Sequence, residues 1–247
     1  MKRYYEGHDG VYQRLDQEGF DCWGRVDFET VEILDFIHSA LKRLHSDKLL
    51  PIPSQVQVLI LGCGTGPVAC VLSQLGYQVS GVDVSPKAIE MAKRQAQQRN
   101  LEIQYWVADL CRESIGELKY NLIIDSHCLH CIVPEVDRTS FLHSTHRALK
   151  KGGIFLTETM IGQLDNDDAY SDENGIVWTP YGTEQPEYEP RECRDGQWYV
   201  PQRLLRSSQE EMNQEITQSG FEVIWQGVRA TRSDQDVPSY QGIALKK

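Results

Sequence analysis

A short apolar run that ends in three closely spaced glycines constrains the fold of this chain more than any other feature. The run reads Val-Leu-Ile-Leu from Val58, and Gly62, Gly64 and Gly66 follow it. An uninterrupted apolar run of this length is typical of a strand buried on both faces. Glycine at its end lets the backbone turn tightly and approach a ligand, and the start of a following helix directs N–H groups outward. The segment therefore predicts a strand, a ligand-binding turn and a helix.

Strands and helices alternate on both sides of this unit. Apolar β-branched runs predict strands at 56–61, 79–84, 103–108, 120–125 and 154–159. Amphipathic spacing and capping residues predict helices at 30–44, 65–75, 85–99, 136–150 and 207–220. Two closing strands at 221–228 and 240–245 are neighbours in sequence, which favours an antiparallel pair. The pattern predicts an α/β fold with a doubly wound, mostly parallel seven-stranded sheet whose last strand is antiparallel.

The negative charge of the chain is concentrated in one segment. The 247 residues carry 25 Lys and Arg against 36 Asp and Glu, a net charge of −11. Residues 158–200 hold 11 acids and 2 arginines, a net −9, so the rest of the chain carries only −2. Nucleic-acid binding needs a basic face, so this balance argues against a nucleic-acid partner.

Three further features bear on the compartment. No apolar run approaches the roughly 18 residues that a membrane span needs. The start, MKRYYEGHDG, is polar and lacks the apolar core of a signal peptide. Seven cysteines are an odd number without regular spacing, which favours free thiols over a disulfide framework. We therefore expect a cytoplasmic protein without a membrane partner.

The alternation of strands and helices stops after Met160. The segment 161–206 contains four prolines and little periodicity, and a loop of that length is usually a lid or a binding loop. Aromatic residues argue against simple disorder there: Tyr170, Trp178, Tyr181, Tyr188, Trp198 and Tyr199. We predict an N-terminal helical cap at 1–50 and a ligand-binding domain at 51–247 that includes 161–206 as an insert.

The glycine turn alone fits more than one ligand. A dinucleotide-binding turn has the pattern Gly-x-Gly-x-x-Gly, because the backbone must approach a diphosphate closely. Counted from Gly62, the last position of that pattern is Pro67. This weakens the interpretation as a dehydrogenase.

Five motifs in order give the chain a more specific resemblance. They are LGCGTG at 61–66, GVDVSP at 81–86, VADL at 107–110, YNLIIDSHCLHCI at 120–132 and LKKGG at 149–153. Together they resemble a class I S-adenosylmethionine-dependent methyltransferase of the small-molecule type. The resemblance implies a Rossmann-like methyltransferase fold and S-adenosylmethionine as the cofactor.

The resemblance also implies roles for residues in these motifs. The glycine turn would lie beside the methionine part of the cofactor, Asp83 would accept hydrogen bonds from the ribose hydroxyls, and Asp109 would contact the adenine amine. The expected cofactor-binding residues in the motifs are Gly62, Cys63, Gly64, Thr65, Gly66, Asp83, Val84, Ala108, Asp109, Leu110, Asp125 and Ser126. Arg25 is a further candidate, as a partner for the cofactor carboxylate, with a surface salt bridge as the alternative.

One position departs from the family pattern. The family often has an acid where this chain has Ile60, and that acid helps to neutralise the cofactor ammonium group. Backbone carbonyls near Gly62 or the carboxylate of Asp125 would have to serve instead.

The resemblance places the acceptor-facing groups after the fourth strand. Methyl transfer from a sulfonium is an in-line displacement in which the protein positions the nucleophile and, where required, removes its proton. The candidate catalytic residues are Asp125, His127 and His130. Histidine titrates near neutral pH, which suits a base, whereas a neutral His130 packed under the cofactor turn is the alternative.

The same stretch contains a pattern with metal-ligand spacing, His127-Cys-Leu-His-Cys131. A structural zinc site needs four ligands, usually in two separated pairs, and no second pair is evident in the sequence. We therefore expect no metal.

Two segments would close the acceptor side, by the same resemblance: the N-terminal region and the insert after Met160. The candidate substrate residues in them are Trp23, Trp178, Tyr181 and Trp198. Acids interleaved with aromatics suit a cationic acceptor, through charge attraction and cation–π contact. This favours an amine, and a solvated acidic loop is the alternative.

The sequence thus predicts the transfer of a methyl group from S-adenosylmethionine to a small molecule. One alternative is a non-catalytic partner module that binds S-adenosylmethionine, and another is a protein methyltransferase. RNA is disfavoured by the acidic charge and by the lack of a basic or aromatic platform motif. We expect a monomer or a homodimer.

Overall fold

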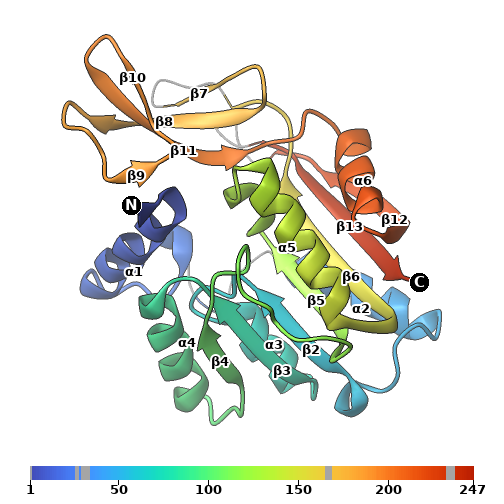
Figure 1. The fold of residues 1–247 in the computed structure, drawn as a ribbon. Coiled ribbons are helices and arrows are strands. Elements are labelled where there is room, and N and C mark those ends of the chain that lie inside the picture. The colour runs from blue at the N-terminus through green and yellow to red at the C-terminus, as the bar shows by residue number, and fades with distance from the viewer. Residues whose placement is uncertain (1, 26–27, 29–33, 165–168, 232–236) are drawn as a thin grey trace.

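A large mixed sheet forms the centre of the molecule. The computed structural model describes residues 2–25, 28, 34–164, 169–231 and 237–247. Within these residues the large sheet has seven strands, in the order β12-β13-β6-β5-β2-β3-β4 (Figure 1). They are β12 (Phe221–Arg229), β13 (Ser239–Lys246), β6 (Leu149–Met160), β5 (Tyr120–Ser126), β2 (Gln57–Leu61), β3 (Gln78–Asp83) and β4 (Gln104–Val107).

All strands of the large sheet run in one direction except β13. The parallel pairing extends from β2 through β3 to β4 on one side and through β5 to β6 on the other. β13 is antiparallel to both β6 and β12. The predicted mostly parallel seven-stranded sheet with a reversed last strand is confirmed.

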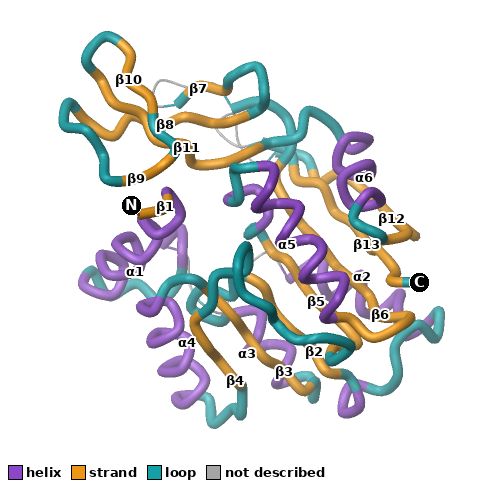
Figure 2. The backbone as a smooth tube through the Cα atoms, in the orientation of Figure 1, coloured by secondary structure: helices purple, strands orange, loops and turns teal. Residues whose placement is uncertain are grey.

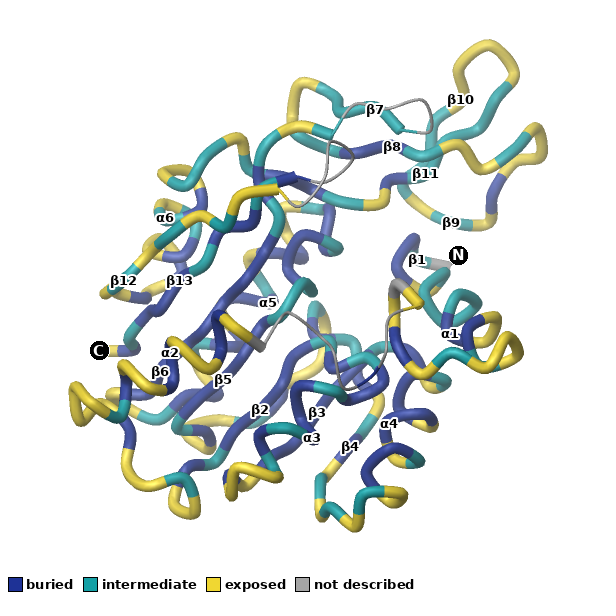
Figure 3. The backbone as a smooth tube through the Cα atoms, turned by 180° about the vertical axis from the view of Figure 1, so that it is seen from behind, coloured by how far each residue is buried: buried dark blue, intermediate teal, exposed yellow. Residues whose placement is uncertain are grey.

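Helices cover both faces of this sheet. The helices are α1 (Gly7–Gln17), α2 (Leu34–Ser46), α3 (Pro67–Gln74), α4 (Pro86–Gln98), α5 (Glu135–Ala148) and α6 (Gln209–Gln218), with short 3-10 turns η1 (Tyr4–Glu6), η2 (Trp23–Arg25), η3 (Pro53–Gln55) and η4 (Leu129–Cys131). α5 and α6 lie on one face, and α2, α3 and α4 on the other (Figures 1 and 3). The first part of the helix predicted at 30–44 lies outside the described residues.

The residues of β2 explain why both faces must be covered. Val58 and Ile60 are buried with the apolar side chains of α2 and α3. Leu59 and Leu61 point the opposite way and are buried with those of α5 and α6. Successive side chains of a strand face opposite sides, so an uninterrupted apolar run matches a strand with two buried faces.

The insert 161–206 forms a sheet of its own (Figure 2). Its strands are β7 (Tyr170–Ser171), β8 (Ile176–Gly182), β10 (Glu192–Arg194) and β11 (Gln197–Leu204), in the order β10-β11-β8-β7. The expectation of a long loop was therefore wrong. Pro180 and Pro201 lie within strands. The register of the β8–β11 pairing shifts at two places, between Trp198 and Tyr199 and between Pro201 and Arg203. Such bulges remove the alternation by which a strand is recognised in a sequence.

The N-terminal segment meets the insert beyond the carboxyl ends of the large sheet. β1 (Lys2–Arg3) pairs in parallel with β9 (Tyr188–Glu189), and β11 contacts both η1 and η4. Asp9 fastens α1 to the start of α4, because its carboxylate accepts hydrogen bonds from the Ser85 hydroxyl (2.6 Å) and from the Lys87 backbone N–H (2.9 Å). Among the described residues, no helix is long and apolar enough to cross a membrane.

A buried arginine ties α5 to α6 and to the insert. The guanidinium of Arg138 donates to both carboxylate oxygens of Glu215, at 2.7 and 2.8 Å, and to the carbonyls of Leu129 (2.8 Å) and Ile132 (3.2 Å). Arg206, at the end of the insert, donates to the same carboxylate at 2.9 Å. This network joins the fold of the large sheet to the segments that surround its carboxyl ends.

The network predicts a loss of stability in acid. Burial of the Glu215 carboxyl raises its pKa, but the hydrogen bonds and charges of Arg138 and Arg206 outweigh burial and lower the pKa from 4.5 to about 2. Because the folded-state pKa is depressed, the stabilisation is present above pH 4.5 and is lost as the pH falls toward 2. We expect Glu215→Gln to remove up to about 3 kcal/mol of the pH-dependent part of the unfolding free energy. Urea unfolding between pH 3 and 7 measures this, and exposed Glu210→Gln, on the same helix, should leave the pH dependence unchanged.

Candidate active site

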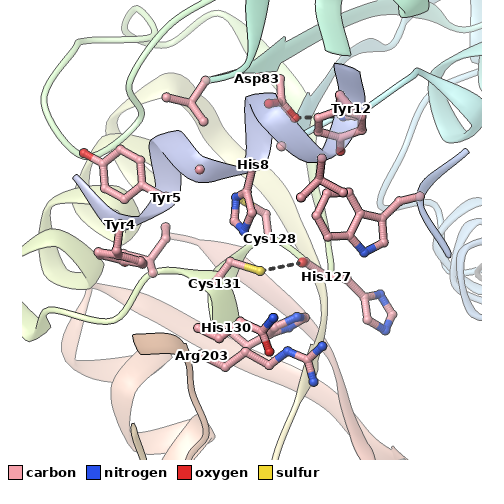
Figure 4. A pocket seen from close by; sticks show the side chains of 18 of the residues that line it. Tyr4, Tyr5, His8, Tyr12, Asp83, His127, Cys128, His130, Cys131 and Arg203 are labelled. Carbon is pink, nitrogen blue, oxygen red and sulfur yellow. Dashed lines mark hydrogen bonds between the residues drawn. The ribbon is translucent and has the colours of Figure 1, made fainter. Parts of the chain in front are cut away.

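A cavity of about 770 Å³ lies beyond the carboxyl ends of the central strands. Its lining comes from η1 and α1, from the turn after β2, from the ends of β3 and β4, from the segment around η4, and from β11 (Figure 4). This volume lies in the range of small-molecule and cofactor sites. The cavity is also where ligands bind in open parallel sheets, at the carboxyl ends of the strands.

The glycine turn after β2 forms one wall. Gly62 and Gly64 have φ angles of +56° and +54°, a conformation that other residues adopt at a cost. A Cβ atom on Gly62 would lie 2.6 Å from the Cβ of Cys128, and one on Gly64 would lie 2.9 Å from the hydroxyl of Tyr12. Glycine is therefore required at both positions for two reasons: the turn needs a positive φ angle, and the packing leaves no room for a Cβ atom.

Asp83, at the end of β3, holds the glycine turn in place. Its carboxylate accepts hydrogen bonds from the backbone N–H of Gly64 and of Ser85, both at 2.9 Å. Burial raises the pKa of Asp83, against the opposing effect of these backbone donors. The side chain still lines the cavity, so its remaining lone pairs are available to a ligand.

Asp109, after β4, is the second carboxylate that lines the cavity. It accepts hydrogen bonds from the Tyr5 hydroxyl at 2.7 Å and from the Cys111 backbone N–H at 3.0 Å. Val84, Ala108 and Leu110 line the cavity beside the two carboxylates, as Cys63 and Thr65 do beside the turn.

The N-terminal segment supplies cavity residues that the sequence reasoning missed. Tyr5, His8 and Tyr12 all line the cavity from η1 and α1. The resemblance assigned the N-terminal region to the acceptor side but singled out only Trp23 and Arg25 there, although Tyr5 and Tyr12 are also aromatic residues of this segment.

Histidines and an arginine line the other end of the cavity. His127, His130 and Arg203 lie there, and His8 of α1 lies between them and Asp83 (Figure 4). His127 adopts a left-handed conformation, with φ at 68°, and its backbone N–H donates to the Glu158 carbonyl at 2.8 Å. Ser126 lines the cavity beside it. Arg203 comes from β11, so the insert contributes directly to this end.

The surroundings of His130 determine both its charge and which ring nitrogen carries the proton. Burial, together with nearby His127 and Arg203, holds the pKa of His130 well below its ordinary value. Its Nδ1 atom accepts a hydrogen bond from the Met160 backbone N–H at 3.3 Å and lies 3.2 Å from the Thr159 hydroxyl. A backbone N–H can only donate, so these partners assign the ring proton to Nε2. His130 is therefore suited to donate a hydrogen bond rather than to accept a proton at Nε2.

Three residues of the predicted cofactor site do not line the cavity. Asp125 is buried below it and accepts hydrogen bonds from the Thr157 hydroxyl and from two backbone N–H groups, and burial raises its pKa to about 6. In this arrangement Asp125 does not line the cavity, and its oxygens already accept from protein donors. Arg25 is exposed and forms a surface salt bridge with Glu18 at 2.7 Å, which was the alternative to a contact with the cofactor carboxylate. Gly66 lies at the start of α3, against Tyr105.

The predicted substrate residues divide into two pairs. Trp23 and Tyr181 line the cavity, each about half exposed. Trp178 is buried within the insert, where its indole N–H donates to Asp172 at 3.0 Å. Trp198 lies near Arg191 and does not line the cavity. The prediction of a substrate contact is thus corrected for Trp178 and Trp198, because both side chains pack within the insert.

The His127-Cys128-Leu129-His130-Cys131 stretch lies on and before η4. Among the residues that the structure describes, no three His, Cys, Asp or Glu side chains are gathered as a metal site. The pattern instead places side chains along the cavity wall, and Cys131 Sγ donates to the His127 carbonyl at 3.8 Å.

Comparison with known families identifies the segment that carries the glycine turn. Residues 58–153 match the family model described as a methyltransferase domain. The match begins in β2, includes the glycine turn and the strand ends at Asp83 and Asp109, and stops in β6. Residues 58–153 thus form a methyltransferase domain. S-adenosylmethionine is the cofactor of this class of domain.

Relatives with curated names match the methyltransferase domain over part of their length. An uncharacterized methyltransferase of Synechocystis sp. is 33% identical over 138 residues, which cover 56% of this chain and 58% of that protein. A ubiquinone biosynthesis O-methyltransferase of Pelagibacter ubique is 32% identical over 143 residues, which cover 56% of this chain and 55% of that protein. The chain thus spans little more than half the length of these two relatives.

Solved structures share the fold over nearly the whole chain. An S-adenosylmethionine-dependent methyltransferase from Clostridium acetobutylicum covers 98% of each chain with a TM-score of 0.64 at 15% identity. The 1,6-didemethyltoxoflavin-N1-methyltransferase of Burkholderia thailandensis covers 100% of this chain and 92% of its own, with a TM-score of 0.58 at 16% identity. At these identities the likeness shows that the methyltransferase fold is shared.

The residues of the methyltransferase domain fit this cofactor. S-adenosylmethionine carries two ribose hydroxyls and an adenine amine, which are hydrogen-bond donors. Asp83 and Asp109 present carboxylate acceptors at successive strand ends, and the backbone of the glycine turn lies beside them without side chains. The cavity therefore offers acceptors and backbone access where the cofactor has donors and a charged amino-acid part.

Proposed function

We propose that this protein is an enzyme that transfers the methyl group of S-adenosylmethionine to a small-molecule acceptor. The observation that carries the proposal is the pair of cavity-lining carboxylates, Asp83 and Asp109, beside the glycine turn of a methyltransferase domain. The cavity extends past them to the end that holds His130 and Arg203, which leaves room for a second molecule. Two curated relatives have names that point to small-molecule acceptors. One is the ubiquinone biosynthesis O-methyltransferase of Pelagibacter ubique, and the other is the magnesium-protoporphyrin O-methyltransferase of Rhodobacter capsulatus.

The chain's own residues would bind and orient the two substrates. The bound cofactor supplies an electrophilic methyl group on a positively charged sulfur. In this proposal Asp83 accepts hydrogen bonds from the ribose hydroxyls, Asp109 accepts one from the adenine amine, and the turn at Gly62 and Gly64 lies against the methionine part. The described residues of the insert and the N-terminal residues 2–25 act as a cap that excludes water from the acceptor, whereas α2 packs on the large sheet.

The two cavity histidines would take different roles at the acceptor. His130 donates a hydrogen bond from Nε2, and so it orients the methyl acceptor through an oxygen or another atom that accepts hydrogen bonds. His127 then remains as the candidate base, where the acceptor must lose a proton. This assignment follows from the backbone donor that occupies Nδ1 of His130.

The described residues give no support to an amine acceptor. That prediction rested on the acids of the insert, but none of the described carboxylates in 161–206 lines the cavity. Asp165, Asp167 and Asp168 lie outside the described residues.

The cytoplasm is the compartment that we propose, since all seven cysteines are free thiols.

The test is methyl transfer from S-adenosylmethionine labelled with tritium in the methyl group. The purified chain is incubated with panels of phenols, carboxylates, thiols and amines, and labelled product is extracted and counted. We expect transfer to at least one panel, with equimolar formation of S-adenosylhomocysteine. Binding of the cofactor without transfer to any panel would favour the non-catalytic module, and absence of cofactor binding would overturn the proposal.

A further inference from the structure

One cation at the acceptor end of the cavity has no counter-charge in the described part of the chain. Arg203 lines the cavity, and no described carboxylate forms an ion pair with it. The neighbouring arginines of the insert are paired: Arg191 with Glu189 at 2.6 Å, Arg194 with Glu192 at 2.7 Å, and Arg206 with Glu135 at 2.7 Å. Arg203 therefore differs from them in facing a ligand space.

The titratable groups around Arg203 do not supply an opposite charge. His8 faces it from α1, and burial followed by the charge of Arg203 lowers the pKa of His8 to about 4. His127, His130 and Cys131 face it from the segment around η4, and burial raises the pKa of Cys131 to about 11. At neutral pH His8, His130 and Cys131 are thus uncharged. Arg14, which also lines the cavity, is exposed.

The charge along the cavity is therefore divided between its two ends. Both described carboxylates that line it, Asp83 and Asp109, lie at the end assigned to the cofactor. Arg203 lies at the opposite end (Figure 4). Charged groups in enclosed sites are usually paired with an opposite charge, and a ligand anion would supply that pair for Arg203.

The walls around Arg203 define the rest of the ligand. In the cavity lining, Val200 and Pro201 come just before Arg203 in β11, and Met160, Tyr181 and Tyr188 add apolar and aromatic surface beside the polar Thr179 and Gln202. A guanidinium presents a planar fork of donors that matches the two oxygens of a carboxylate. The surroundings thus combine one anion-binding group with apolar surface.

We propose that the acceptor is a largely apolar, carboxylate-bearing small molecule whose carboxylate is anchored by Arg203. The proposal rests on the proposed function, because it names the class of molecule that the same cavity would methylate. In this arrangement Arg203 positions the molecule and His130 lies beside it as a hydrogen-bond donor.

The test compares benzoate with benzamide, which have the same ring and differ in the charge of the planar group. Binding of each is measured by calorimetry, with and without saturating S-adenosylhomocysteine. We expect benzoate to bind about tenfold more tightly than benzamide, or better, and Arg203→Gln to remove this preference. Arg203→Lys should retain part of it, because the charge remains while the fork is lost. Arg194→Gln, an exposed arginine of the insert outside the cavity, should bind both probes as the unaltered protein does.

Two results would overturn the anchoring role of Arg203. One is equal binding of benzoate and benzamide to the unaltered protein, and the other is a preference for benzoate that survives in Arg203→Gln. Affinity for S-adenosylhomocysteine should be the same in all variants. Failure of S-adenosylhomocysteine to bind would contradict the proposed function alone, because the preference for benzoate is also measured without it.

Discussion

Asp83→Asn should weaken the binding of S-adenosylhomocysteine by about 30-fold, equivalent to about 2 kcal/mol. Two losses add in this variant. The carboxylate proposed to accept hydrogen bonds from the ribose hydroxyls becomes an amide with a single acceptor oxygen. The same change places an amide NH₂ against the backbone N–H of Gly64 or Ser85, which now donate to the carboxylate at 2.9 Å. Calorimetric titration with S-adenosylhomocysteine measures the effect.

Asp16→Asn is the matched control for this change. Asp16 is a carboxylate of α1 that pairs with Arg94 at 2.5 Å and with Lys87 at 2.7 Å, outside the cavity. We expect its substitution to leave the affinity for S-adenosylhomocysteine unchanged. Equal affinity of Asp83→Asn and the unaltered protein would show that Asp83 does not contact the ligand.

Arg138→Met should lower the free energy of unfolding by about 3 kcal/mol. The side chain is 1% exposed, so its removal leaves the Glu215 carboxylate with fewer donors and takes the guanidinium donor away from the carbonyls of Leu129 and Ile132. Because Leu129 and Ile132 flank His130 in the segment around η4, the variant should also loosen the acceptor end of the cavity. Urea unfolding, followed by circular dichroism, measures the loss.

Arg147→Met provides the comparison on the same helix. Arg147 is exposed and has no described ion pair, so its substitution should change the unfolding free energy by less than about 0.5 kcal/mol. A double variant in which Arg138 and Glu215 are both replaced by Met should recover part of the stability, because it removes the buried carboxylate that Arg138→Met leaves with Arg206 as its remaining cation. Equal stability of Arg138→Met and Arg147→Met would contradict the role of the buried network.

The central sheet could be predicted from local patterns. The apolar run at Val58 and the alternation of strands and helices are sufficient for a parallel, doubly wound sheet, because each pattern depends on residues close in sequence. The strand ends at Asp83 and Asp109 follow from the same pattern, since the carboxyl ends of parallel strands meet at one edge. Both residues line the cavity, and it is the resemblance to methyltransferases that assigned them to the cofactor.

The acceptor end could not be predicted in the same way. It is assembled by pairings between distant segments, such as β1 with β9 and β11 with β8. Arg203 was not a candidate, because the bulges around Pro201 hide the strand that carries it. Asp125, near the end of β5, was a candidate by resemblance, but its position in the sequence does not show that the Thr157 hydroxyl and two backbone N–H groups donate to its oxygens.

A crystal structure with S-adenosylhomocysteine tests the central claim most directly. The account predicts density in the cavity, with the ribose hydroxyls within hydrogen-bond distance of the Asp83 carboxylate and the adenine amine beside Asp109. It also predicts that the sulfur faces the end of the cavity that holds His130 and Arg203. Density elsewhere on the molecule, or a ribose that lies away from Asp83, would contradict the account.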